Sequence, residues 1–209
     1  MQCADVLLQF LEVATHTVLF CRQVYPVEVF EERRKYGAPV WISRHPALRD
    51  YVSRTVLSLR DWMSQGLIER FNIILKDDEG FVWERFVLQI ASDGAGPTSQ
   101  CPPELESALR AFLLKLRVCD AQLAPTPCTT FAIVVDSASE AVTETRDWLR
   151  AEAPDVPDYV DVDGGDSEDA PPMHRRVVPL KSSAPYAIPG LRLQLWVEQA
   201  EHPPAVPAP

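Results

Sequence analysis

The segment from Ala4 to Val24 has the spacing of a helix, yet it is apolar over most of its circumference. Between Asp5 and Arg22 the only charged residue is Glu12. A helix of this kind has to be buried on several sides, so the segment predicts a central helix enclosed by other layers. Apolar or small residues recur on one face at Val6, Phe10, Val13, Thr17, Cys21 and Val24, and on the adjoining face at Leu7, Leu11 and Val18.

The other elements follow from apolar spacing and turn residues. Pro26 disfavours helical geometry at Tyr25 and should end the first helix there. The resulting order predicts an α+β fold in which three helices cover an antiparallel sheet. We expect a short amphipathic turn or helix and then a loop over 27–41, a second helix over 46–64, a β-hairpin pairing 71–75 with 86–90, a third helix with its apolar stripe over 105–119, a buried central strand over 129–135, a polar helix-like stretch over 139–150, and a final strand over 191–198.

Length and charge distribution predict how the chain is divided. The chain has 209 residues and a formal net charge of −10. A chain of this length can bury a full core without disulfides or metals, so we expect one domain over residues 1–200. Residues 155–169 carry seven acids and no base, which predicts a solvated acidic linker. Residues 201–209 are rich in proline and are expected to form a disordered tail.

Charge and hydropathy also exclude classes of partner. An acidic chain lacks the basic surface that neutralises phosphates, so we expect no direct contact with nucleic acid. The longest apolar stretch, over 13–21, is far shorter than the roughly 20 residues that span a membrane. The N-terminal residues lack the basic segment of a secretory signal. We therefore expect an intracellular protein without membrane contact.

The sequence offers no motif for catalysis, a metal or a cofactor. Its four histidines are far apart, and none stands at ligand spacing from a cysteine. The five cysteines include no C-x-x-C pair, so we expect small buried apolar residues in a reducing compartment. Residues 161–166 partly match a calcium loop, but Pro172 stands where such a loop needs Glu. We expect no catalytic residue, no metal site and no cofactor.

The final strand carries a feature typical of a binding surface. Its apolar residues alternate inward, which leaves Arg192, Gln194, Trp196 and Glu198 on the outer face. Two interpretations of Trp196 are open: it forms an exposed contact for a partner, or a loop covers it. A long acidic linker precedes this strand, so the strand could leave the sheet, or close over a guest peptide.

Several segments together resemble the HORMA-domain family, and within it the mitotic-arrest-deficient-like branch of accessory subunits of translesion DNA polymerase zeta. The resemblance is collinear from about residue 3 to residue 200. It rests on LQFLEVA at 8–14, VYPV at 24–27, FEERRKY at 30–36, HPAL at 45–48, LRAFLLK at 109–115, VCDA at 118–121, VPLK at 178–181 and LQLWVE at 193–198.

This resemblance implies a HORMA fold with a C-terminal safety belt, over about residues 150–200, that wraps a proline-containing peptide. It implies a non-catalytic adaptor in the nucleus that clasps the catalytic subunit of polymerase zeta and recruits a Y-family scaffold polymerase. A spindle-checkpoint or meiotic HORMA adaptor with a different client is the alternative. An AAA-type remodelling ATPase is a further partner known elsewhere in the family, and the sequence leaves its role here open.

The resemblance also assigns residues by position. Tyr51 corresponds to a client-peptide contact, and Tyr159 takes the place of an aromatic residue of the belt. Val177, Gln194 and Trp196 correspond to the surface for the scaffold polymerase. Glu32, Arg110 and Ala121 correspond to the surface of a HORMA-to-HORMA dimer, where Glu32 replaces an expected base. The chain also begins almost at its first predicted helix, without the short leader that the resemblance leads us to expect.

Overall fold

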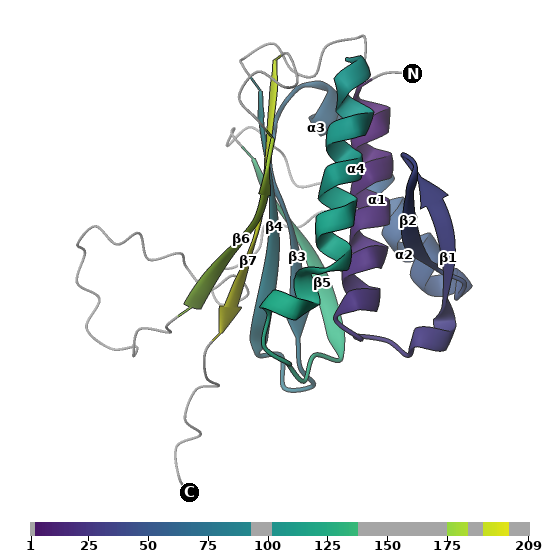
Figure 1. Ribbon diagram of the computed structural model, residues 1–209, viewed down its shortest axis with the longest axis vertical. Coiled ribbons are helices and arrows are strands. Elements are labelled where there is room, and N and C mark those ends of the chain that lie inside the picture. Colours follow the sequence, from purple (N-terminus) through teal and green to yellow (C-terminus); the bar gives the residue numbers. More distant parts are fainter. Residues whose placement is uncertain (1–2, 93–101, 138–174, 184–189, 201–209) are drawn as a thin grey trace, which may run out of the picture.

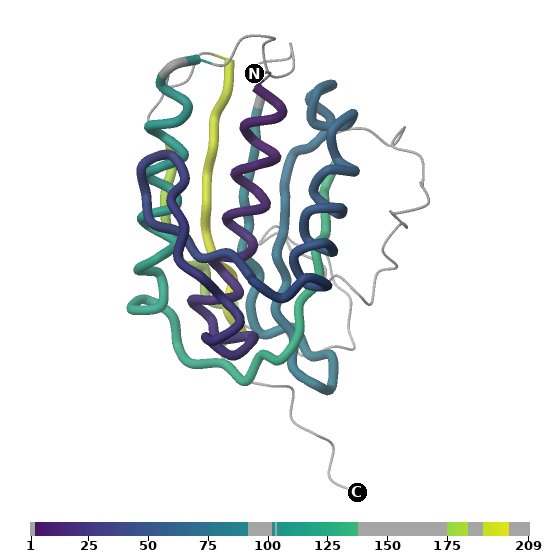
Figure 2. Tube along the Cα trace, turned by 90° about the vertical axis from the view of Figure 1, so that its right-hand side faces the viewer, coloured from purple at the N-terminus to yellow at the C-terminus, as the bar shows by residue number. Residues whose placement is uncertain are grey.

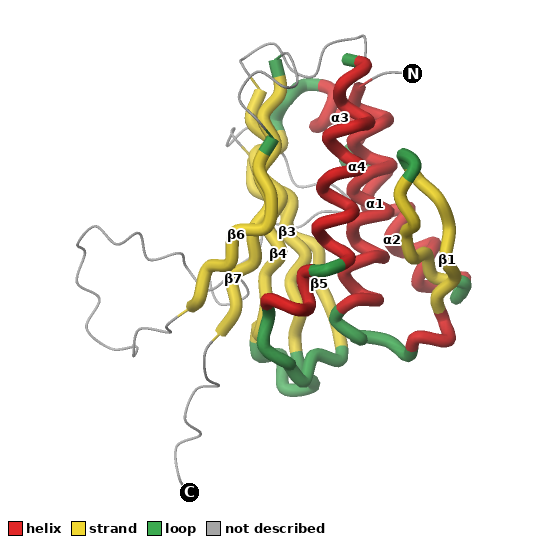
Figure 3. Tube along the Cα trace, viewed as in Figure 1, coloured by secondary structure: helices red, strands yellow, loops and turns green. Residues whose placement is uncertain are grey.

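The computed structural model describes residues 3–92, 102–137, 175–183 and 190–200. In this part of the chain a sheet and a group of helices form separate layers (Figures 1 and 3). A short hairpin of two strands lies on the other side of the helices from the sheet. The expected α+β arrangement is therefore confirmed. The predicted helix over 139–150, the acidic linker over 155–169 and the tail over 201–209 lie outside the described residues.

The first helix, α1 (Cys3–Cys21), is the centre of the fold. Figure 2 shows it between α4 (Pro103–Arg117) and α2 (Pro46–Leu57), in front of the sheet. Its apolar residues are buried nearly all round, as the sequence predicted. The buried hydroxyls of Thr15 and Thr17 each donate a 2.8 Å hydrogen bond to the carbonyl one turn earlier, which satisfies these polar groups inside the core.

By length and composition α1 could cross a membrane, but 78% of its most apolar window is buried within the fold. That burial is typical of a core helix. The helix ends at Cys21, a little before the expected stop at Tyr25. Gln23 adopts a left-handed conformation (φ 52°), and the amide of Val24 donates back to the carbonyl of Leu19, as in a Schellman termination.

The second predicted helix is two helices, α2 and the short α3 (Arg60–Ser64). The backbone tightens between them, where the amide of Leu59 donates to the carbonyl of Val56 at 3.2 Å. This turn buries the side chain of Leu59 completely. The third predicted helix is confirmed as α4. It begins at a proline, which is tolerated there because a first-turn residue needs no amide hydrogen. Two 3₁₀ turns, η1 (Val27–Val29) and η2 (Cys119–Gln122), follow α1 and α4.

The sheet has five antiparallel strands in the order β5-β3-β4-β7-β6. The expected hairpin is confirmed, and its alternating apolar residues face the helices. At its turn the Asp77 carboxylate accepts hydrogen bonds from the amides of Glu79 and Phe81 and from the indole of Trp83. The strands are β3 (Ile68–Lys76), β4 (Val82–Ser92), β5 (Thr130–Ser137), β6 (Arg175–Ser182) and β7 (Leu191–Ala200).

Two predictions about strands were wrong. The segment expected to be a turn and a loop over 27–41 contains a hairpin of β1 (Phe30–Lys35) and β2 (Ala38–Ser43). Its two-residue turn, Tyr36–Gly37, has positive φ at both positions (50° and 71°), as a tight hairpin requires. The strand expected to be central, β5, instead lies at one edge of the described sheet, and most of its side chains are half-buried.

The final strand has the predicted alternation but extends to Ala200, and Glu198 does not have the predicted exposure. Glu198 lies on the outer face of the sheet, yet only 5% of its surface is exposed. The reason is that Arg85 stands directly opposite on β4, and the indole of Trp196 donates to the Glu198 carboxylate at 3.1 Å. Strand β6, which the sequence analysis did not predict, pairs with the other side of β7.

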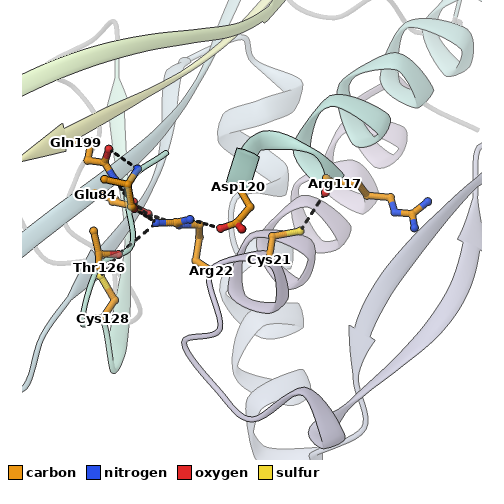
Figure 4. Close-up of polar contacts among 9 residues, drawn as sticks. Cys21, Arg22, Glu84, Arg117, Asp120, Thr126, Cys128 and Gln199 are labelled. Carbon is orange, nitrogen blue, oxygen red and sulfur yellow. Dashed lines mark hydrogen bonds and ion pairs between the residues drawn. The ribbon is translucent and has the colours of Figure 1, made fainter. Parts of the chain in front are cut away.

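A buried polar cluster fixes the end of β7 against α1 (Figure 4). Arg22, just after α1, contacts both carboxylate oxygens of Glu84 on β4 at 2.6 and 2.8 Å, and it also pairs with Asp120. The Gln199 amide donates to Glu84 at 2.7 Å and to the Ala124 carbonyl at 2.9 Å, and it accepts from the Ala124 amide at 3.0 Å. Burial raises the pKa of Glu84, and Arg22 and Gln199 oppose that rise.

We expect Glu84→Gln to lower the free energy of unfolding by about 3 kcal/mol, because the buried Arg22 guanidinium loses its bidentate partner. Urea unfolding measures this change. The matched control is Arg33→Gln, which removes an exposed pair with Glu31 and should change stability by less than about 0.5 kcal/mol. Equal effects of the two substitutions would contradict a structural role for the buried pair.

His16 should make stability depend on pH. It is completely buried on α1, and neither ring nitrogen has a hydrogen-bond partner in the described part of the chain. Burial, assisted by the charge of Arg49, lowers its pKa from 6.5 to about 4. The unfolded state therefore binds a proton between pH 6.5 and 4 that the folded state does not, and stability falls as the pH drops through this range. It is fully retained above pH 6.5.

Between pH 7 and pH 5, the titration of His16 should cost the unsubstituted chain about 2 kcal/mol of stability. We expect the His16→Met variant to lose that much less over the same interval. Urea unfolding of both proteins at the two pH values measures the difference. Carboxylates that titrate in the same range affect both proteins equally, so they cancel in the comparison. Parallel losses in both proteins would contradict the assignment to His16.

Candidate functional site

Tyr51 lies beside an apolar hollow of about 430 Å³ between α2 and the edge of the sheet. It is 47% exposed and makes an edge-to-face contact with Phe131 of β5 (ring centroids 5.7 Å apart). Tyr25 contacts the same Phe131 ring at 6.3 Å. Burial raises the pKa of Tyr25, so its hydroxyl stays protonated as a hydrogen-bond donor. The remaining lining residues are Val29, His45, Ala47 and Leu48.

This hollow adjoins an unpaired strand edge. Strand β5 pairs with β3 on one side, and no described strand pairs with its other side. An open edge presents backbone donors and acceptors in register for an added strand, and an apolar hollow beside it can take that strand's side chains. The geometry suits an extended peptide. The second predicted client contact, Tyr159, lies outside the described residues.

The three residues predicted for the scaffold polymerase meet on the other face of the sheet. Val177, Gln194 and Trp196 all line one open cleft of about 580 Å³, called the outer-face cleft below. The pairing register explains this, since Trp196 stands between Pro179 of β6 and Val87 of β4. Val177 is 53% exposed, whereas Trp196 is half-buried. In the described structure, therefore, Trp196 forms part of a cleft wall rather than a fully exposed knob.

The three residues predicted for a dimer surface come from three elements, and all are exposed. Glu32 is on β1, Arg110 is on α4 and Ala121 is in η2. The Arg110 guanidinium lies beside Gly37 at the turn of the β1–β2 hairpin, 3.5 Å from where a Cβ would stand. Arg110 of α4 therefore packs against this hairpin, and the dimer surface stays a prediction.

The described part of the chain contains no cluster of three or more His, Cys, Asp or Glu side chains that could hold a metal. Burial also makes its thiols poor nucleophiles. It raises the pKa of Cys119 to about 12, and the pKa values of Cys21 and Cys128 to about 11. The chemistry that the described surfaces offer is recognition through backbone edges, aromatic rings and charged groups.

The sequence analysis did not find several residues of these surfaces. Phe131 was assigned to a buried central strand, and only the edge position of β5 gives it a surface role. Arg85 and Asn72 line the outer-face cleft, although they sit within strands whose apolar neighbours suggested only core packing. Pro179 belongs to β6, a strand that was not predicted. The period-2 pattern of β4 was the available signal for Arg85, because it places this side chain on the face of the sheet that points away from the helices.

Comparison of the sequence with known proteins gives the relationship. No family model matches the chain. It is 35% identical over 203 residues to the mitotic spindle assembly checkpoint protein MAD2B of Bos taurus, covering 95% of this chain and 92% of that protein. The MAD2B of Homo sapiens is 34% identical over the same length and coverage. The chain belongs to the MAD2B family.

The chain is also similar to polymerase subunits. The present MAD2B-family chain is 33% identical over 121 residues to the DNA polymerase zeta processivity subunit of Arabidopsis thaliana, covering 58% of this chain and 56% of that one. The predicted family relationship is confirmed. Its relatives are named as processivity subunits and checkpoint proteins, which is consistent with a non-catalytic role.

Solved structures confirm the HORMA fold. A chain of the mitotic checkpoint complex superposes with a TM-score of 0.73 at 19% identity, covering 94% of this chain and 97% of that one. C. elegans HTP-2 bound to HTP-3 closure motif 1 gives a TM-score of 0.62 at 11% identity, with 94% and 85% covered. At these identities the likeness establishes the fold.

Proposed function

We propose that this MAD2B-family chain is a non-catalytic adaptor in translesion DNA synthesis. It clasps a proline-containing peptide of the polymerase zeta catalytic subunit and bridges that subunit to a Y-family scaffold polymerase. The observation that carries the proposal is the open edge of β5 beside the aromatic hollow at Tyr51 and Phe131. A chain built to add one peptide strand needs such an edge.

The relatives support this choice of client. Curated relatives in Arabidopsis thaliana and Schizosaccharomyces pombe are named DNA polymerase zeta processivity subunits. Solved structures with this fold are described as HTP-2 bound to a HIM-3 closure motif and to HTP-3 closure motif 1. In the peptide site proposed here, main-chain hydrogen bonds give affinity and side-chain pockets give selectivity.

The two surfaces suit a bridging role because they share no lining residue. The hollow at Tyr51 lies on the helix side of β5, whereas the cleft at Trp196 lies on the opposite face of the sheet. One partner can therefore occupy each surface at the same time. The net charge of −10 supports contact with DNA through these partners rather than directly.

Further parts of the proposal follow from the family. A translesion adaptor works in the nucleus, and we place the chain there. Release of a clasped peptide requires the belt to open, so an AAA-type remodelling ATPase is a reasonable third partner. Self-association through Glu32, Arg110 and Ala121 belongs to the proposal as a weak interaction, because an acid at position 32 removes a base from that surface.

A second candidate is a checkpoint or meiotic adaptor with a different client peptide. The names of the animal relatives favour it, since they refer to the mitotic spindle assembly checkpoint. The outer-face cleft distinguishes the two, because only the translesion role requires it to bind a Y-family polymerase.

Tyr51→Ala should weaken binding of a labelled proline-containing peptide from the polymerase zeta catalytic subunit about tenfold, because it removes an aromatic contact from the hollow. Fluorescence anisotropy gives the affinity, and a chase with unlabelled peptide gives the release rate. Leu57→Ala is the matched control: it lies on the same helix, is 48% exposed and does not line the hollow. Equal affinities of both variants would remove Tyr51 from the site.

Trp196→Ala should weaken binding of the Y-family scaffold polymerase by about thirtyfold or more, while client-peptide affinity stays unchanged. Titration calorimetry with the full chain measures both. Trp83→Ala is the control, because Trp83 is also half-buried and its indole also donates to a carboxylate, that of Asp77, but it lies outside the cleft. Scaffold binding that survives in Trp196→Ala would contradict the assigned surface.

A further inference from the structure

The outer-face cleft contains a cationic side chain that lacks a hydrogen-bond acceptor. Arg85 is only 8% exposed, and it lines the cleft beside Trp196. Its Nε and Nη2 atoms are buried and donate no hydrogen bond in the described structure. A guanidinium has five N–H donors and no acceptor, so only an acceptor group can satisfy these atoms. Such unpaired buried donors are costly to the free protein.

The local acid balances this charge only in part and leaves these donors without a hydrogen bond. Glu198 stands directly opposite on β7, but its Oε2 is 3.8 Å from Arg85 Nε, too far for a hydrogen bond. Its Oε1 accepts from the Trp196 indole instead. A second cation, Arg175 on β6, has both Nη atoms buried without an acceptor among the described residues. Burial and the nearby charge of Arg85 lower the pKa of Arg175. Within the residues that the structure describes, two guanidiniums therefore share one carboxylate.

The other charged groups that line the cleft, Arg70 and Asp136, lie towards its far end and are opposite in charge. Arg70 of β3 faces Asp136 of β5 at 3.8 Å, and both side chains are exposed. Between the two ends lies Asn72, whose amide donates to the Val134 carbonyl, while its buried Oδ1 has no donor in the described structure. The excess of positive charge is thus local to Arg85 and Arg175, although the chain as a whole is acidic.

The free donors of Arg85 define the chemistry that would satisfy them. Nε and Nη2 form the side edge of the guanidinium, whose two parallel N–H groups match the two oxygens of a carboxylate. A bidentate acid at this place would also lie next to Trp196, Val177 and Pro179, which offer apolar contacts around it. These apolar contacts favour a protein side chain over an isolated phosphate or a membrane surface.

We propose that the outer-face cleft is a carboxylate-binding site, in which Arg85 pairs side-on with an Asp or Glu side chain of the scaffold polymerase. The proposal rests on the proposed function, because it names the chemistry of the same surface. It makes Trp196 the apolar anchor and Arg85 the selectivity contact. An incoming acid completes the charge balance that Glu198 leaves short.

The test uses the full chain and a purified Y-family scaffold polymerase. Arg85→Lys keeps the charge that faces Glu198 but removes the fork, so the fold is retained while the bidentate contact is lost. We expect about tenfold weaker scaffold binding for Arg85→Lys and a larger loss for Arg85→Met. Client-peptide affinity should not change. Thermal unfolding checks that each variant is folded. The control is Arg33→Gln, which changes an exposed arginine of β1 outside the cleft and should leave scaffold binding unchanged.

A double-mutant cycle then identifies the acid. Each Asp and Glu of the scaffold polymerase's binding region is replaced by Asn or Gln, and each variant is titrated against the unsubstituted chain and Arg85→Lys. One replacement should weaken binding to the unsubstituted chain but have little further effect on Arg85→Lys. The carboxylate site would be overturned if folded Arg85→Lys binds like the unsubstituted chain, or if the effects are additive for every acid. In either case Trp196→Ala would still test the adaptor role separately. Absence of any scaffold binding by the unsubstituted chain would contradict both.

Discussion

The buried contact between Arg22 and Glu84 is the interaction on which the arrangement of the layers depends. It joins the end of the central helix to the middle of the sheet, and Gln199 connects the end of β7 to the same carboxylate. Asp120 and the Ala124 backbone bring in the segment that follows α4. Four distant parts of the sequence therefore meet at one charge pair. Since Trp196 and Gln194 sit on β7, the outer-face cleft depends on a contact made on the opposite side of that strand.

Much of the fold could be predicted because its strongest elements have simple patterns. The central helix was evident from its lack of charge, and β7 from its strict alternation. The hairpin of β1 and β2 was missed because its charged run looked like a solvated helix or turn, and its turn residues are Tyr36 and Gly37 rather than the usual Asn-Gly pair. A strand's position in the sheet is set by pairings distant in sequence, so nothing local distinguished an edge from a centre at β5.

The candidate surfaces could likewise be predicted only where they depend on local sequence patterns. Val177, Gln194 and Trp196 were named from a resemblance, and the pairing of β6 with β7 is what brings them together. Alternation placed Glu198 on the outer face correctly, but it could not indicate burial, because that depends on the residue opposite. Arg85 provides that partner from a strand about 110 residues earlier. Cross-strand register, rather than composition, decides which polar residues become part of a site.

The strand order has a consequence for how the protein is made. In the finished sheet β4 is an interior strand, but its partner β7 comes about 100 residues later in the chain. At typical rates of synthesis that interval lasts about 5 to 20 s. Throughout it, β4 is an edge with unpaired backbone groups and an apolar face. Until β7 is synthesised, the strand that will lie inside the sheet is therefore an edge that can pair with other chains. Pairing with β7 then covers this edge.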